Sequence, residues 1–196
     1  MKNIILILSL FTLPLVADYT SIKELPKQLK PFIDKGTTPI WFEKNDLNGD
    51  GTDDYVLVLE RPYKETKDGD LPKDQRPLLI IINENGTLKV AKRSEKVVYC
   101  SKCGGMMGDP FMGVNTQNKR FVVSHYGGSR WKWSVQYTFG YSRRDKSWQL
   151  IEVKEENFDG FDEDNRNTTI SIPPKDFGLI DIEAFDPEKW KGVGPK

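Results

Sequence analysis

The sequence predicts a mainly β protein, built as an antiparallel meander of hairpins with one short helix near its N-terminus. Aromatic residues are abundant, with ten Phe, seven Tyr and five Trp among 196 residues, and aromatic side chains favour strands. Short apolar runs recur between turn-forming residues. Residues 131–141 alternate between aromatic or apolar and polar side chains, which is the period of a strand with one buried face. Both a propeller-like blade and a sandwich fit this pattern.

The first residues have the pattern of a signal peptide. A lysine precedes the apolar residues 4–13, and small Ala17 follows them, so residues 1–17 are expected to be cleaved. Residues 18–196 then form a single β-rich domain, periplasmic or secreted, with no membrane span. Removing the one lysine leaves 28 basic and 29 acidic side chains. This balance argues against nucleic acid as a partner.

The short helix is expected within residues 22–35. Leu29 and Phe32 contribute to a helical spacing of apolar residues, Pro31 limits the length, and Gly36 follows as a stop.

Hairpins account for most of the remaining chain. Asn85-Gly86 supplies a tight turn, and residues 61–77 and the acidic stretch 157–167 are expected to interrupt the meander. The apolar tail, residues 173–196, is expected to pack back on the sheet. The expected strands cover residues 39–43, 55–60, 78–82, 87–90, 96–99, 120–125, 131–141 and 148–153.

One acidic loop has the spacing of a calcium site. It offers oxygen ligands at five alternate positions, and Gly51 permits the sharp turn on which they converge. An EF-hand would need Glu at position 12, where Leu57 stands inside a strand, so the loop is expected between two strands. Hard oxygen donors favour Ca²⁺ over transition metals. The predicted ligands are Asp46, Asn48, Asp50, Thr52 (through its carbonyl) and Asp54.

At this loop the sequence resembles a known repeat family. The run Asp-Leu-Asn-Gly-Asp-Gly-Thr-Asp-Asp-Tyr-Val-Leu-Val, followed by Leu-Leu-Ile-Ile-Ile-Asn-Glu-Asn-Gly, looks like an FG-GAP/VCBS-type repeat of integrin-like propellers over residues 40–90. The resemblance implies that the same five residues hold Ca²⁺. The whole chain also looks similar to exported bacterial proteins that have this loop, a Cys-x-x-Cys-Gly-Gly segment and a His-Tyr-Gly-Gly segment. That likeness implies no particular activity.

The two cysteines have three interpretations. In an exported protein, Cys100 and Cys103 are expected to form a disulfide that shapes a Gly-rich loop. A thiol–disulfide enzyme would need a helix after Cys100, which Gly104-Gly105 opposes. A Cu(I) site is the third interpretation. It would combine both cysteines with soft ligands from Met106, Met107, Met112 and His125.

No catalytic constellation is evident in the sequence. His125 is the only histidine, and Ser124 faces the other side of the same strand, so the two cannot form a triad. The aromatic row that starts at Trp131 fits either a buried sheet face or a sugar-stacking platform. Loops at one edge of a meander can gather into a binding surface. The predicted contact residues are His125, Tyr126, Arg130 and Trp131, in a cleft shared with the disulfide loop.

These observations lead to one function hypothesis and one alternative. The first is an exported, calcium-binding, non-enzymatic interaction protein, whose partner is a protein or a cell-envelope component. The alternative is an extracytoplasmic thiol-redox or copper-handling protein that uses Cys100 and Cys103.

Overall fold

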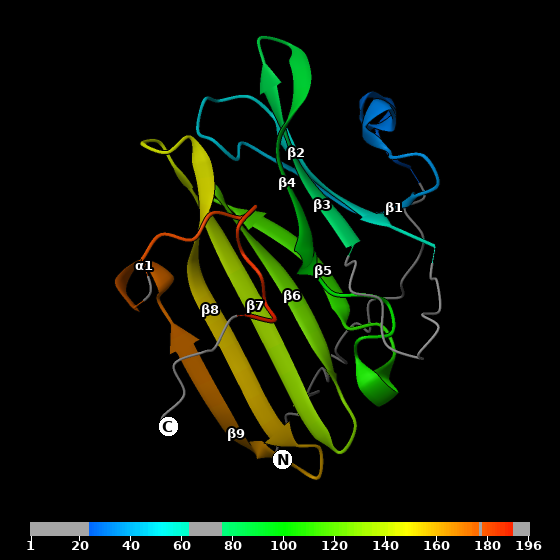
Figure 1. Ribbon diagram of the computed structural model, residues 1–196, viewed down its shortest axis with the longest axis vertical. Helices are drawn as coiled ribbons and strands as arrows, with labels where there is room; N and C mark the ends of the chain where they lie inside the picture. Colours follow the sequence, from blue (N-terminus) through cyan, green and yellow to red (C-terminus); the bar gives the residue numbers. More distant parts are fainter. Residues whose placement is uncertain (1–23, 63–75, 177, 190–196) are drawn as a thin grey trace, which may run out of the picture.

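The computed structural model describes residues 24–62, 76–176 and 178–189, which form two antiparallel sheets (Figure 1). This confirms the predicted β meander. Sheet A has four strands and sheet B has five, each in sequence order. Sheet A comprises β1 (Thr38–Asn45), β2 (Asp54–Glu60), β3 (Arg76–Glu84) and β4 (Thr87–Val98). Sheet B comprises β5 (Phe111–Gln117), β6 (Arg120–Gly128), β7 (Trp131–Ser142), β8 (Ser147–Asp159) and β9 (Asp162–Ser171).

Three short helices accompany the sheets in the described ranges. They are the 3₁₀ helices η1 (Lys27–Phe32) and η2 (Gly105–Met107) and the α-helix α1 (Pro173–Asp176). None of the described helices is long and apolar enough to cross a bilayer. The predicted signal peptide, residues 1–17, lies outside the described residues.

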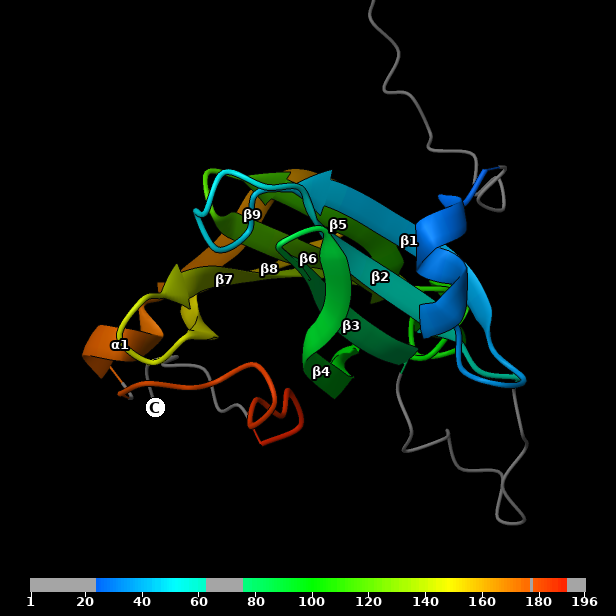
Figure 2. The same cartoon turned by 90° about the horizontal axis from the view of Figure 1, so that it is seen from above.

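Sheet A buries both of its faces. Val56 and Ile80 are paired in the register and point into the core shared with sheet B, and both are fully buried. Leu57 and Leu79, paired on the other face, pack in a second cluster with Leu29 of η1. Figures 1 and 2 show η1 on the side of sheet A away from β7, β8 and β9. The result is a sandwich of two sheets with η1 as an outer cover.

The inner face of sheet B forms the other half of the core. Phe121 and Phe139 stack with their ring centroids 5.3 Å apart. The segment after α1 packs on the same face, since the Phe185 ring lies 4.9 Å from that of Tyr137 and Ile182 is fully buried. The described part of the C-terminal tail therefore packs back on the sheet as predicted.

Strand β1, the first strand of sheet A, packs against β5, the first strand of sheet B. Trp41 of β1 covers Gly113 of β5, where an added Cβ would come within 2.6 Å of the indole ring. The indole N–H of Trp41 donates to the carbonyl of Val114 at 3.0 Å. Its ring also meets Phe111 edge-on, with centroids 5.9 Å apart. Only glycine at position 113 permits this approach.

Several element boundaries differ from those predicted. Strand β5 was not expected, because Gly113 and Asn115 weaken its apolar pattern. The acidic stretch is the end of β8 and most of β9, which pair although their side chains are polar. The two expected strands at 87–90 and 96–99 belong to one irregular strand, β4, whose register with β3 shifts twice. The expected N-terminal helix is a 3₁₀ helix with Pro31 inside it.

A buried cation joins the two sheets. Arg76, 3% exposed, begins β3, and its Nε lies 2.5 Å from Oε2 of Glu60 at the end of β2. Its two terminal nitrogens donate to the carboxylate of Asp109 at 2.8 and 2.6 Å. Asp109 precedes β5, so this bidentate pair links sheet A to the start of sheet B. Removing a carboxylate partner of a buried guanidinium is strongly destabilising, because it leaves the positive charge buried without compensation.

We expect Asp109→Ala to lower the free energy of unfolding by about 2–4 kcal/mol, because it leaves Arg76 buried with one carboxylate instead of two. Urea unfolding measures the change. Asp145→Ala is the matched control, since Asp145 pairs with Arg144 at an exposed turn and such pairs contribute at most about 1 kcal/mol. Equal losses in the two variants would contradict this role for Arg76.

Candidate functional site

The two motifs of interest lie at opposite ends of β5. The acidic loop, residues 46–53, connects β1 to β2, and Asn45 beside it donates to Thr116 near the end of β5 at 3.2 Å. The disulfide loop, residues 100–110, leads into the start of β5. In Figure 1 the acidic loop is at the upper end of the molecule, and the turns between β6 and β7 and between β8 and β9 are at the lower end.

The acidic loop is a compact turn flanked by strands, as predicted. The Asp46 carboxylate accepts backbone N–H groups from Gly49 at 2.6 Å and Gly51 at 3.1 Å. Asp50 accepts both the N–H and the hydroxyl of Thr52, at 2.8 and 2.6 Å. Side-chain hydrogen bonds from Thr52 and Asn48 lower the pKa of Asp50. The loop is thus ordered by its own donors, with Asp50 held as a carboxylate.

Asp54 attaches this loop to the sheet. It is fully buried, and its two oxygens accept the backbone N–H groups of Leu47 at 3.0 Å and Asn83 at 2.9 Å. Burial raises its pKa. The Leu47 side chain is buried in the shared core, and its carbonyl accepts the indole N–H of Trp148 at 3.2 Å. The loop therefore contacts β3 and β8 as well as the strands that it joins.

The donors of the loop suit calcium in chemistry, because all five predicted ligands offer hard oxygens. Within the described ranges, no three acidic, histidine or cysteine side chains converge closely enough to hold a metal ion. The calcium ligand set of Asp46, Asn48, Asp50, Thr52 and Asp54 therefore stays a prediction.

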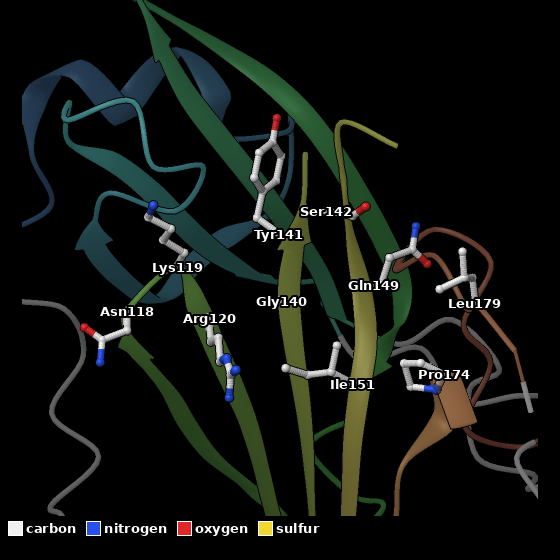
Figure 3. Close-up of a pocket in the computed structure, with 10 residues that line it drawn as sticks. All are labelled: Asn118, Lys119, Arg120, Gly140, Tyr141, Ser142, Gln149, Ile151, Pro174 and Leu179. Carbon is white, nitrogen blue, oxygen red and sulfur yellow. The ribbon is translucent and has the colours of Figure 1, made fainter. Parts of the chain in front are cut away.

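A cleft of about 360 Å³ lies at the end of sheet B that is close to the acidic loop. Its floor is Gly140, which sits between Arg120 and Gln149 across the register of three strands. The Oε1 of Gln149 is buried without a hydrogen-bond partner among the described atoms. Figure 3 shows Gln149 near Leu179, and Lys119 turned toward the acidic loop, where its ammonium packs on Gly49. The sequence did not reveal this cleft, because its residues come from β6, β7, β8, α1 and the connecting segments, which are far apart in the chain.

Cys100 and Cys103 lie at disulfide distance, with 2.21 Å between their sulfur atoms. Cys100 is 6% exposed, and the N–H of Cys103 donates to the carbonyl of Cys100 at 3.0 Å, which closes a tight turn. The three residues of η2 begin only at Gly105, so Cys100 does not start a helix. This arrangement lacks the helix dipole that activates the first cysteine of thiol–disulfide enzymes.

Two glycine pairs bring the disulfide loop against the end of β6. The N–H of Gly128 donates to the carbonyl of Gly104 at 2.9 Å. A Cβ at Gly127 would come within 2.5 Å of the Trp133 ring and 3.0 Å of the Gly104 Cα. The Cys-x-x-Cys-Gly-Gly and His-Tyr-Gly-Gly segments therefore pack backbone on backbone. This contact requires glycine at position 127. A Cβ at Gly104 or at Gly128 would instead meet a carbonyl oxygen of its own loop, at 2.4 and 2.1 Å respectively.

His125 is not part of a surface cleft, contrary to expectation. It is 1% exposed and stacks on Tyr99 with 4.2 Å between ring centroids. Its Nε2 accepts the backbone N–H of Tyr99 at 3.2 Å. Burial, reinforced by the charge of Arg76, lowers its pKa to about 3. The imidazole is therefore neutral at physiological pH, and its Nε2 lone pair is engaged, which disfavours a role in copper binding or acid–base chemistry.

The exposed aromatic residues lie in the β6–β7 and β8–β9 turns, at the same end of sheet B as the disulfide loop. Trp131 is 67% and Phe161 86% exposed, and the Arg130 guanidinium lies 5.9 and 5.3 Å from their ring centroids. Arg130 also binds Asp159 through two nitrogens, the closest contact being 2.7 Å. This pair fastens the β6–β7 turn to the β8–β9 turn. Trp131 therefore does not fill the core, although the aromatic row after it does face inward.

Methionines extend this exposed surface. Met106 is 85% and Met107 44% exposed on η2, and the Sδ of Met107 lies 3.2 Å from the ammonium of Lys132. We call the group Met106, Met107, Arg130, Trp131 and Phe161 the Met–Trp end. Of the predicted contacts, Arg130 and Trp131 belong to it. Tyr126 is half-buried and stacks at 6.5 Å on Phe158, and Phe161 was missed because it stands in the acidic stretch.

No protein-family model matches the chain, and no curated protein matches it. The FG-GAP/VCBS resemblance therefore rests on the loop residues and their flanking strands.

The buried histidine predicts a specific acid sensitivity. In the unfolded chain the His125 imidazole has a pKa near 6.5, whereas in the folded protein its pKa is about 3. Between these values the unfolded state binds a proton that the folded state does not. Folding stability should therefore fall as pH drops below 6.5, by about 1.4 kcal/mol per pH unit from this group. His125→Gln keeps an acceptor for Tyr99 and removes this slope. Urea unfolding at pH 7, 5.5 and 4.5 measures both proteins, and parallel losses would contradict the assignment.

Proposed function

We propose that this is an exported, calcium-stabilised and non-enzymatic binding protein, whose Met–Trp end contacts a partner protein or a cell-envelope component. The observation that carries the proposal is that exposed Trp131 and Phe161 flank Arg130 at the end of sheet B against which the loop with exposed Met106 also packs. Monomeric proteins seldom expose apolar side chains in groups unless the group has a binding role.

The Met–Trp end has the composition of a binding surface. Trp and Arg are enriched among residues that dominate interface energy, and here Trp131 and Arg130 are adjacent. The disulfide, the glycine contacts and the Arg130–Asp159 pair hold the loops and turns around it. Ordering these segments before binding lowers the entropy lost when a partner docks.

The calcium part of the proposal is supported by the spacing and anchoring of the acidic loop. Its carboxylates alternate with residues that permit a tight turn, and Leu47 and Asp54 fix the loop in the shared core. A cation bound there would neutralise neighbouring carboxylates in the native chain only. Its binding energy would therefore add to the stability of both sheets.

Calcium should raise the melting temperature of the wild-type protein, and EDTA should lower it. At a free calcium concentration 100 times the dissociation constant, the gain is about 2.7 kcal/mol. Asp46→Ala should abolish the difference between calcium and EDTA. Asp53→Ala is the matched control, because Asp53 lies in the same loop but outside the predicted ligand set and pairs with Lys44. It should keep the calcium response, and a wild type indifferent to EDTA would refute the site.

A photo-crosslinking residue at position 131 tests the Met–Trp end in cells that make the protein. We expect a defined crosslinked species from position 131, and its loss when Arg130 and Phe161 are both changed to Ala. The control position is Val90, which is 45% exposed on β4 in the other sheet. Crosslinking of equal yield and pattern from both positions, or none from position 131, would contradict the proposed surface.

A further inference from the structure

A second cleft, of about 240 Å³, opens on the inner face of sheet B beside Tyr99, the residue that follows β4. Its lining includes the rings of Tyr99, Trp133 and Tyr137 and the polar side chains of Glu155 and Asn157. Sites for drug-sized ligands occupy about 300–1,000 Å³. This cleft therefore suits a smaller group.

The three rings form walls that are not parallel. Tyr99 lies 6.1 Å from Trp133 at an interplanar angle of 58° and 6.4 Å from Tyr137 at 67°. A hydrogen bond of 2.5 Å between the two tyrosine hydroxyls fixes their relative position. Rings inclined in this way can present more than one π surface to a single guest.

Gly127 explains why there is space beside these rings. The Trp133 indole lies across Gly127 on β6, where any Cβ would come within 2.5 Å of it. Trp133 is opposite Asn157, and Val135 is opposite Glu155, in the register of β7 with β8. Because the indole leans toward β6, the inner face over this part of β8 stays open.

Glu155 gives the cleft a negative charge without an internal counter-ion. Among the described residues it makes no hydrogen bond or ion pair, whereas its neighbours Lys154 and Glu156 pair with each other at 2.6 Å. Burial raises the pKa of Glu155. The pKa of Tyr99 is raised mainly by burial and further by the charges of Glu155 and Glu188. The field in the cleft therefore favours a positively charged guest.

We propose that this cleft binds an organic ammonium group, with the faces of Tyr99 and Trp133 against the cation and Glu155 as its counter-charge. Aromatic faces attract cations that lie within about 6 Å of the ring centroid, and the attraction is greater where water is excluded. An inorganic cation would instead require several oxygen ligands, which the aromatic lining does not offer. This site goes beyond the proposed function, because it uses neither the acidic loop nor the Met–Trp end.

The test compares choline with 3,3-dimethylbutan-1-ol, which has the same shape but carbon in place of the charged nitrogen. Calorimetric titration of the full chain should show saturable binding of choline, at least tenfold tighter than that of the neutral alcohol. Butylammonium, as a third probe, distinguishes a preference for primary amines from one for quaternary amines. Saturable binding of either cation, with the neutral analogue weaker, supports the site.

Glu155→Gln should weaken binding of the preferred cation at least tenfold. Glu156→Gln is the matched control on the opposite face of the same strand, and it should leave the affinity unchanged. The proposal is overturned if the neutral alcohol binds as well as the cations, if neither cation saturates, or if Glu155→Gln has no effect. Should Glu155→Gln fail to fold, the comparison of probes on the wild-type chain still decides.

Discussion

The architecture depends on the need of sheet A to bury both of its faces. Strands β2 and β3 carry almost uninterrupted apolar residues, and Val56, Leu57, Leu79 and Ile80 are all at most 2% exposed. Each such side chain contributes about 1.5–3 kcal/mol when it leaves water. One face requires sheet B and the other requires η1, so neither cover is optional. The position of the acidic loop follows from this packing, because Leu47 must enter the same core.

The sequence predicted the elements in which hydrophobic period and burial agree. The alternation from Trp133 to Phe139 indicated the inner face of β7. Asn85-Gly86 indicated the hairpin between β3 and β4 of sheet A. The pattern could not reveal β9, because that strand is held by backbone pairing with β8 and little by apolar side chains. Nor could it reveal β5, where Gly113 is required by the approach of a tryptophan distant in sequence.

The site residues divide in the same way. Local spacing was sufficient to single out the acidic loop and the cysteine pair. Exposure, however, is set by tertiary packing, which placed His125 under Tyr99 and left Trp131 outside the core. The glycine pairs were visible as a motif, but their purpose was not. They allow two loops and an indole ring to meet, and that contact shapes both the Met–Trp end and the cleft at Glu155.

Strand β9 is the last strand of sheet B in the described chain, so one side of its backbone has no strand partner there. Open edges of this kind can recruit a strand from another molecule and start aggregation. The exposed side chains of Asp162, Asp164 and Arg166 lie along this strand. Charged side chains on an edge strand are one of the means by which proteins discourage such pairing. The polar character that made β9 unrecognisable from its hydrophobic pattern therefore also makes this edge a poor template for a further strand.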